Sequence, residues 1–219
     1  MAVVIIPARM ESQRLPGKPL ASIGELPLVV RVARQAQKAR RVDSVAVATD
    51  SAEIAKACDA HAVAHVMTRV EHVSGTDRVA EASATVGAAH IINVQGDEPF
   101  IDPRDLDAIA ETLERGARLA TLRASIADPA EYRSRQVVKV VASDSGHALY
   151  FSRAPIPYGL NDETIATRAY RHIGVYGYAA DTLREWTQAP RHTLELTEGL
   201  EQLRALAMGI PITLLDAYT

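Results

Sequence analysis

The sequence predicts an α/β protein with an open, mostly parallel sheet that is covered by helices. Three apolar runs support this prediction, at residues 2–6, 44–48 and 90–94. The first run is rich in β-branched residues and has no polar alternation, as expected of a strand that is buried on both faces. Helix patterns lie between the runs, and this alternation indicates βαβ crossovers. In such sheets ligands bind outside the carboxyl ends of the strands.

The predicted helices begin at recognisable signals. Pro27 suits a first helical position, and Asp102 followed by Pro103 is typical of a cap and a first helical residue. Asp50 stands three residues before Glu53, a spacing that resembles a capping box. The predicted helices span residues 28–39, about 50–59, 76–86 and about 102–115. Pro7 is expected to end the first strand.

The pattern changes in the second half of the chain, after a strand predicted at 119–125. Runs at 137–142 and 148–152 flank Asp144-Ser145-Gly146 and predict an antiparallel hairpin. A loop, a strand at 171–178, one long helix at 194–208 and a strand at 212–215 follow. We therefore predict a single domain over residues 1–219, in which residues 137–178 form an insertion.

Composition excludes several classes of protein. The 27 acidic and 24 basic side chains leave a formal charge of −3, so the chain offers no broad basic face for nucleic acid. No run approaches the ~18 apolar residues of a membrane span, and residues 2–6 are too short for the core of a signal peptide. Cys58 is the only cysteine, which excludes an internal disulfide and a cysteine-rich zinc site and favours a cytoplasmic protein. We expect Cys58 to pack in the core.

A cationic loop follows the first predicted strand. Arg9, Arg14 and Lys18 lie there against a single acid, Glu11. A triphosphate carries about four negative charges, and each unit pair at 4 Å contributes ~4 kcal/mol at an effective dielectric constant near 20. Because the loop leaves the carboxyl end of a strand, we predict phosphate binding rather than a solvated surface loop. Neither a Walker motif nor Gly-x-Gly-x-x-Gly is present, which disfavours ATPases and dinucleotide dehydrogenases.

A carboxylate follows the third predicted strand. Asp97 lies after Gly96 at this carboxyl end. Mg²⁺ takes oxygen ligands and is commonly held by one or two carboxylates together with substrate phosphates. The alternative is that Asp97 only caps a turn. A triphosphate cradle near a metal-binding carboxylate indicates phosphoryl or nucleotidyl transfer, which needs no nucleophilic side chain. His61 and His65 have a metal-ligand spacing, but we discount them because they fall across a helix-to-strand junction.

Segments in both halves of the chain resemble those of one known family, the 3-deoxy-manno-octulosonate (Kdo) cytidylyltransferases. In chain order they are Val3-Val4-Ile5-Ile6-Pro7-Ala8-Arg9, Ser12-x-Arg14-Leu15-Pro16-Gly17-Lys18-Pro19-Leu20, Ala48-Thr49-Asp50, His72-x-Ser74-Gly75-Thr76-Asp77-Arg78, Asn93-Val94-Gln95-Gly96-Asp97-Glu98-Pro99, Val137-Val138-Lys139-Val140-Val141, Ala148-Leu149-Tyr150-Phe151-Ser152-Arg153, Arg171-His172-Ile173-Gly174-Val175-Tyr176-Gly177-Tyr178 and Leu200-Glu201-Gln202-Leu203-Arg204. The first segment is shared by several sugar nucleotidyltransferases, whereas the later ones are narrower.

The resemblance implies a glycosyltransferase-A-like fold and a cytoplasmic homodimer that makes CMP-Kdo and pyrophosphate from CTP and Kdo, with Mg²⁺, for lipopolysaccharide synthesis. It implies that residues 137–178 bind the sugar and contribute to dimerisation. By position, the implied nucleotide-binding residues are Ala8, Arg9, Lys18, Ser74, Gly75, Thr76 and Arg78, and the implied metal ligand is Asp97. The implied contacts of the sugar acid are Arg14, Gln95, Arg153, His172, Tyr176, Glu201 and Gln202.

The implied mechanism is in-line attack by the anomeric hydroxyl of Kdo on the α-phosphorus of CTP, with Mg²⁺ bridging phosphate oxygens and Asp97. Arg9 and Lys18 would stabilise charge on the departing pyrophosphate. An anionic polyol suits cations for its carboxylate and amide or carboxylate acceptors for its hydroxyls. As helical neighbours, Glu201 and Gln202 point ~100° apart, so we expect at most one of them to face a site unless the helix end frays.

Three alternatives remain open from the sequence. The sugar could be the 8-amino form of Kdo or sialic acid, or the chain could be a non-catalytic nucleotide-binding module. Family members continue after the last strand with Gly-Val-Asp-Thr-Pro-Glu-Asp-Leu, whose first aspartate is a second metal ligand. The sequence to Thr219 lacks this stretch, and Asp216 does not match it. We expect the stretch to lie beyond Thr219, the alternative being a metal site with Asp97 alone.

Overall fold

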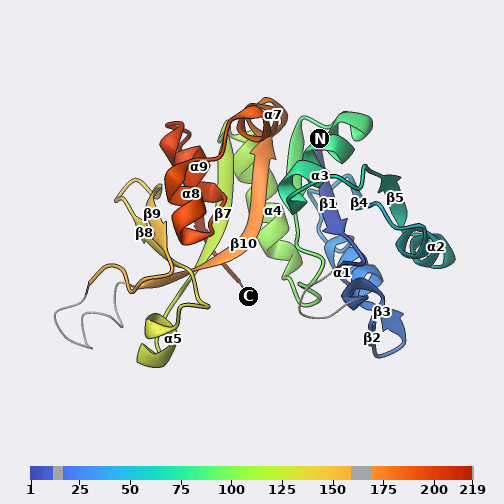
Figure 1. Cartoon of the computed structure of the whole chain (residues 1–219), viewed down its shortest axis with the longest axis horizontal. Coiled ribbons are helices and arrows are strands. Elements are labelled where there is room, and N and C mark those ends of the chain that lie inside the picture. The colour runs from blue at the N-terminus through green and yellow to red at the C-terminus, as the bar shows by residue number, and fades with distance from the viewer. Residues whose placement is uncertain (12–16, 159–168, 219) are drawn as a thin grey trace.

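A mostly parallel central sheet organises the chain, and it confirms the predicted fold class (Figure 1). The computed structural model describes residues 1–11, 17–158 and 169–218, so Arg14 lies outside the described residues. The strand order is β11-β7-β10-β6-β1-β4-β5. These strands are β1 (Ala2–Ala8), β4 (Ser44–Thr49), β5 (Ala64–Met67), β6 (His90–Asn93), β7 (Leu119–Ser125), β10 (Tyr170–Ala179) and β11 (Ile212–Asp216). β1, β4, β5 and β6 are mutually parallel, whereas β10 runs antiparallel between β6 and β7.

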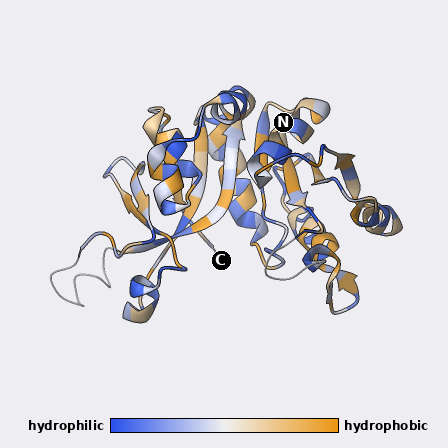
Figure 2. Cartoon of the chain, viewed as in Figure 1, coloured by the Kyte–Doolittle hydropathy of each residue, from blue (hydrophilic) through white to orange (hydrophobic). Residues whose placement is uncertain are grey.

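Helices cover both faces of the sheet. Their bounds are α1 (Leu28–Ala36), α2 (Ala52–Ala60), α3 (Gly75–Val86), α4 (Pro103–Glu114), α5 (Pro129–Arg133), α7 (Ala180–Gln188), α8 (Thr193–Glu198) and α9 (Gln202–Ala207). Val4 and Ile6 of β1 pack in one core with residues of α1 and α4, and Val3 and Ile5 pack in a second core with residues of α3 and α7. Figure 2 shows hydrophobic residues along β1 and a mixture of hydrophobic and hydrophilic residues on α4. Burial of both faces explains why the first apolar run lacks alternation.

Pro7 does not end the first strand, contrary to the prediction, because β1 continues to Ala8. Pairing with β6 stops at Ile5, whereas pairing with β4 continues through Pro7 and Ala8. At Pro7 the strand therefore has a neighbour on one side only. Proline lacks a backbone N–H and is tolerated where no neighbouring strand requires that donor. The strand end thus carries Ala8 beyond the edge of β6.

The cap of α2 is Ser51 rather than Asp50, which corrects the predicted capping box. Ser51 Oγ accepts a hydrogen bond from the Ile54 backbone N–H at 3.4 Å. The Asp50 carboxylate instead accepts one from Arg78 at 2.7 Å. The competing interaction is a charged contact from α3, which local sequence spacing does not reveal. Pro27 similarly precedes the first helical residue of α1 rather than occupying it.

The long helix predicted over 194–208 is two short helices, α8 and α9, and the prediction is wrong on this point. Gly199 ends α8 with φ of 64°, a left-handed conformation that glycine adopts without steric cost. The chain then turns through Leu200 and Glu201 before α9 begins at Gln202. A buried ion pair joins the two helices, with Arg204 Nη2 2.7 Å from Glu195 Oε1. This break brings the turn toward the carboxyl edge of β6.

The predicted antiparallel hairpin is present as β8 (Lys139–Ala142) and β9 (Ala148–Ser152). β8 also pairs with β10, which is itself a strand of the central sheet. The assignment of residues 137–178 to sugar binding and dimerisation stays a prediction. In the small second sheet, β2 (Ser22–Ile23) pairs with β3 (Leu26–Pro27). Among the described residues, no helix combines the length and the apolar character needed to cross a membrane.

Cys58 is fully buried in the core on the α1 side of the sheet, as predicted. Burial raises the pKa of its thiol to about 11, so the thiol stays protonated at neutral pH. His61 caps the end of α2 and His65 lies in β5, which confirms that a helix-to-strand junction separates them. Cys58 therefore has a packing role.

Candidate active site at the carboxyl edge of the sheet

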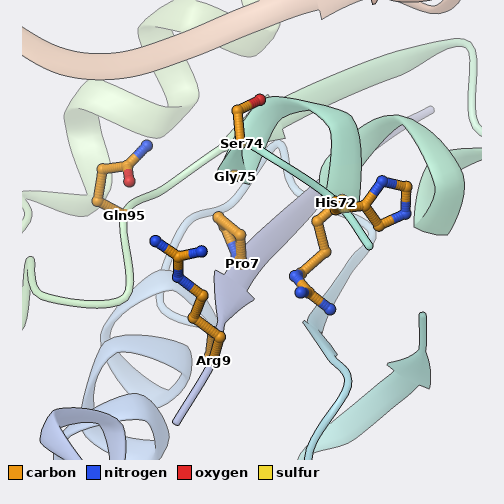
Figure 3. Close-up of a pocket in the computed structure, with 8 residues that line it drawn as sticks. Pro7, Arg9, His72, Ser74, Gly75 and Gln95 are labelled. Carbon is orange, nitrogen blue, oxygen red and sulfur yellow. The ribbon is translucent and has the colours of Figure 1, made fainter. Parts of the chain in front are cut away.

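A cavity of about 220 Å³ lies where β1 ends, beside the start of α3 (Figure 3). Its lining residues are Pro7, Ala8, Arg9, His72, Ser74, Gly75, Arg78 and Gln95. In Figure 3 the Arg9 side chain extends past Pro7 toward the side of the cavity formed by Gln95, while His72 lies on the opposite side. Five of the seven implied nucleotide-binding residues line this cavity, namely Ala8, Arg9, Ser74, Gly75 and Arg78.

Two glycines allow the backbone to approach β1 closely at this cavity. A Cβ on Gly75 would lie 3.3 Å from Pro7 Cγ, and one on Gly96 would lie 3.0 Å from the Pro7 carbonyl oxygen. A capping box fixes the start of α3, because Ser74 Oγ accepts from the Asp77 backbone N–H at 3.2 Å and the Asp77 carboxylate accepts from Ser74. The start of α3 and the loop after β6 are thereby held against the end of β1.

Arg78 lines this cavity, but its charge is already paired with a carboxylate. Its side chain is 3% exposed, its guanidinium lies 2.7 Å from Asp50 Oδ2, and it donates a second hydrogen bond to Thr68. Sequence reasoning assigned no role to His72, although His72 lies in a quoted motif. His72 Nε2 pairs with Glu81, and this hydrogen bond lowers the pKa of the Glu81 carboxyl. Both pairs join α3 to the segments that precede it.

Lys18 and Asp97 form an ion pair, and neither residue belongs to the lining of the first cavity. Lys18 Nζ lies 2.6 Å from Asp97 Oδ2, and the two side chains are 37% and 47% exposed. Lys18 begins a short 3-10 helix, and Asp97 lies in the loop after β6. Burial, followed by the charge of Asp97, raises the pKa of the neighbouring Glu98 carboxyl.

The donor set at Asp97 fits Mg²⁺ better than a metal held by protein ligands alone. Among the described residues, no group of three or more His, Cys, Asp or Glu side chains could hold a metal ion. A single accessible carboxylate beside a phosphate-binding loop is, however, a common arrangement for Mg²⁺, which retains waters and takes substrate phosphates as ligands. Asp97 is thus the residue that could hold this ion.

A second cavity of about 200 Å³ adjoins the first, and Gly75 and Gln95 line both. Its other lining residues are Thr76, Asn93, Gly174, Tyr176, Trp186, Gly199, Leu200, Glu201 and Gln202. Four of the seven implied sugar contacts therefore lie together, namely Gln95, Tyr176, Glu201 and Gln202. Burial raises the pKa of Tyr176 well above its usual value, which keeps the phenol protonated.

Glu201 and Gln202 both line the second cavity, contrary to the expectation from helical spacing. The reason is the break at Gly199, because Glu201 lies in the turn before the first residue of α9. Gln202 is 4% exposed, and its Nε2 has no hydrogen-bond partner among the described residues. Thr76 Oγ1 donates a hydrogen bond to Glu201 Oε2 at 2.7 Å. Thr76, an implied nucleotide contact, thus lines the second cavity and not the first.

Neither of these two cavities has His172 or Arg153 in its lining. The His172 ring packs 5.3 Å from the Tyr176 ring, and its Nε2 lies 3.0 Å from Thr121 Oγ1. Burial lowers the pKa of His172 to about 3, so the imidazole is neutral and supplies no charge to an anion at pH 7. Arg153 Nε donates to the Glu198 carbonyl at 2.9 Å, beside the β8–β9 hairpin.

Sequence reasoning missed several walls of the second cavity, chiefly Asn93, Gly174 and Trp186. Asn93 is the last residue of β6. Its position at the carboxyl end of a strand could have identified it as a site residue from the sequence. Gly174 lies on β10 and Trp186 on α7, the next helix, and both are more than 80 positions beyond Asn93 in sequence. Their convergence depends on the antiparallel path of β10, which no local pattern indicates.

The fold and the paired cavities define a cytidylyltransferase: a family model described as Cytidylyltransferase matches residues 3–212. A relative from Verminephrobacter eiseniae named 3-deoxy-manno-octulosonate cytidylyltransferase is 48% identical over 226 residues, covering 94% of this chain and 83% of its own. A relative of the same name from Polynucleobacter asymbioticus is 47% identical over 216 residues, which cover 96% of this chain and 85% of the relative. The chain belongs to the 3-deoxy-manno-octulosonate cytidylyltransferase family.

A solved structure agrees with this membership. The structure of CMP:2-keto-3-deoxy-manno-octonic acid synthetase complexed with CTP superposes with a TM-score of 0.94 at 41% sequence identity. The superposition covers 99% of this chain and 89% of that chain. The fold of this chain is therefore that of a protein whose structure was solved with CTP.

Proposed function

We propose that the chain transfers the cytidylyl group of CTP to the anomeric hydroxyl of Kdo, giving CMP-Kdo and pyrophosphate for lipopolysaccharide synthesis. Two adjoining cavities with common walls at Gly75 and Gln95 are the observation that carries this proposal. A transfer reaction requires its two substrates to meet, and the shared walls provide that meeting point. Family membership and the structural likeness to a CTP complex support the identity of both substrates.

The first cavity holds the nucleotide in this proposal. Ala8, Ser74 and Gly75 offer a close backbone surface, and the guanidinium of Arg9 extends into the same space. Lys18 would leave its exposed ion pair with Asp97 and contact the triphosphate when the nucleotide binds. Both cations would stabilise the charge that develops on the departing pyrophosphate.

Asp97 would hold Mg²⁺, which when bound neutralises phosphate charge and lowers the barrier to attack at the α-phosphorus. The accessible carboxylate of Asp97 and its exposed ion pair with Lys18 support this part of the proposal. Because Lys18 and Mg²⁺ would both be attracted to Asp97, binding of the nucleotide would redistribute these contacts rather than bury an unpaired charge.

The second cavity holds the hydroxylated part of the sugar acid. Gln95, Asn93 and Gln202 supply amide groups, and Glu201 supplies a carboxylate acceptor. Tyr176 remains protonated and is able to donate a hydrogen bond. The contacts expected of Arg14, Arg153 and His172 with the sugar stay proposals, since Arg14 lies outside the described residues.

Pyrophosphate release with a panel of acidic sugars tests the proposed function. The wild-type chain is incubated with CTP, MgCl₂ and either Kdo, 8-amino-Kdo or sialic acid, and with Kdo after chelation of the metal. We expect release with Kdo and Mg²⁺ and none with sialic acid. Release with sialic acid alone would assign a different substrate, and CTP binding without release would indicate a non-catalytic nucleotide-binding protein.

We also propose that the protein is a cytoplasmic homodimer. Leu149 on β9 and Leu196 on α8 are 61% and 62% exposed, and in this proposal a second copy of the chain would cover them. Light scattering at micromolar concentration checks the assembly: the expected mass is twice the 23.7 kDa of the chain. A mass equal to one chain would contradict it.

A further inference from the structure

We propose that Thr76 is a positioning residue for the sugar, whose hydroxyl holds the Glu201 carboxylate in the orientation that accepts hydrogen bonds from the substrate. This inference rests on the proposed function and assigns Thr76 to the sugar side of the site. Thr76 Oγ1 donates to Glu201 Oε2 at 2.7 Å, across 125 positions of sequence. Both residues line the second cavity.

The first turn of α3 stands between the two cavities. Ser74 and Gly75 line the cavity that contains Arg9, whereas Thr76 lines the cavity that contains Glu201. Successive helical residues point ~100° apart, so one turn can present different residues to two adjacent spaces. The capping box of Ser74 with Asp77 fixes this turn. Thr76 therefore has a defined direction before any substrate binds.

The Glu201 carboxylate depends on Thr76 for its orientation. Within the described parts of the chain, Thr76 is the one side chain that donates a hydrogen bond to it, and no basic group lies within ion-pair distance. The guanidinium of Arg204, on α9, instead donates hydrogen bonds to Glu195 Oε1 at 2.7 Å and to Glu195 Oε2 at 2.8 Å. A carboxylate offers about four acceptor positions, so Glu201 retains acceptor capacity after it binds Thr76.

An acceptor and a donor then lie side by side in the second cavity. Glu201 offers carboxylate lone pairs, and the neighbouring Gln202 Nε2 is buried with no partner in the part of the chain that the structure describes. This combination suits vicinal hydroxyl groups, each of which both donates and accepts. The negative charge of Glu201 disfavours a second carboxylate here. Thr76 thus helps the cavity to take the polyol end of the sugar acid and to reject its acidic end.

The test compares Thr76→Val, which removes the hydroxyl at nearly constant volume, with Thr76→Ser, which retains it. We expect Thr76→Val to raise KM for Kdo about tenfold, equivalent to about 1.4 kcal/mol, with KM for CTP unchanged. Thr76→Ser should restore most of the KM for Kdo. Thr112→Val is the matched control, because Thr112 is also a half-buried helical threonine and its hydroxyl bonds only to its own helix.

A rise in KM for CTP rather than for Kdo would assign Thr76 to nucleotide binding and overturn the inference. Unchanged values of KM for both substrates would also overturn it. In a Glu201→Gln background, Thr76→Val should raise KM for Kdo by a smaller factor than it does in the wild type. Fully additive effects of the two substitutions would also overturn the inference. A crystal structure of Thr76→Val gives a readout that does not depend on the sugar: the Glu201 carboxylate should turn from its wild-type position. An unmoved carboxylate would overturn the inference, whereas a wild-type chain that releases no pyrophosphate with Kdo would contradict the proposed function instead.

Discussion

Lys18 Nζ lies 2.6 Å from Asp97 Oδ2, which joins the short 3-10 helix that follows β1 to the loop after β6. The two residues are 79 positions apart in sequence and come from adjacent parallel strands. Their contact places the cationic loop and the carboxylate on the same edge of the sheet. The pair is accessible to solvent, so it contributes little to stability and is available for exchange with a ligand.

Asp97→Asn should remove most of the turnover. Loss of the carboxylate charge removes the group proposed to hold Mg²⁺, and we expect kcat to fall about 100-fold or more. Because Asp97 is 47% exposed, the free energy of unfolding should change by about 1 kcal/mol or less. Pyrophosphate release and urea unfolding measure the two quantities, with Asp144→Asn in the hairpin turn as the control. A near-normal rate in Asp97→Asn would contradict the assignment.

His172 should make the protein less stable as the pH falls below neutrality. Burial lowers its folded-state pKa to about 3, whereas an unfolded histidine titrates near ~6.5. Between these values the unfolded chain binds more protons, so the free energy of unfolding falls as the pH is lowered. We expect His172 to account for about 2 kcal/mol between pH 7 and pH 5.

Urea unfolding of the wild type and of His172→Phe at pH 7 and pH 5 measures this contribution. The variant should show a smaller pH dependence, whatever its absolute stability. In the wild type, the ring-proton chemical shifts of His172 should stay those of a neutral imidazole down to pH 5. Titration of that ring near pH 6.5, or equal pH dependence in the two proteins, would show that the site is not desolvated.

Gly177→Ala should destabilise the packing of α4 on the sheet. A Cβ at this position on β10 would lie 2.2 Å from Ile109 Cγ2 and 3.0 Å from Leu113 Cδ1. Overpacking of this kind costs about 1–3 kcal/mol, which urea unfolding would detect. Gly174→Ala on the same strand is the control, because its Cβ would have no atom within 4 Å. Equal stability of the two variants would mean that α4 adjusts freely.

Arg204→Met should destabilise the chain more than a surface substitution, because it removes the close buried partner of Glu195 and leaves this carboxylate with Arg191 at 3.7 Å. The side chains of Arg204 and Glu195 are 8% and 5% exposed. Breaking a buried pair by removing one partner typically costs about 3–5 kcal/mol. The double variant Arg204→Met with Glu195→Leu should recover part of this loss in urea unfolding. A double variant that loses the sum of both single effects would contradict a direct pair.

The sheet was predictable from the sequence, and so was the edge of the sheet at which Lys18 and Asp97 lie, because both depend on local patterns. Buried parallel strands require continuous apolar runs, and the carboxyl ends of such strands meet at one edge. The break at Gly199 was not predictable from helical periodicity, since the apolar spacing continues across it. The left-handed conformation of Gly199 is what separates α8 from α9.

The second cavity was less predictable because distant segments form it. Thr76 and Glu201 are separated by 125 positions, and Trp186 joins them from α7. Family resemblance identified Glu201 and Gln202, but helical geometry alone suggested that they would diverge. Asp50 shows the converse case: its spacing predicted a cap, whereas a contact with Arg78 from α3 determines its position.

The most direct measurement of the central claim is a crystal structure of the chain with CTP and Mg²⁺. We expect the triphosphate between the loops that carry Arg9 and Asp97, with Lys18 Nζ moved from the carboxylate to a phosphate oxygen. Nucleotide bound at another part of the surface, or bound while the 2.6 Å contact of Lys18 with Asp97 persists, would contradict it.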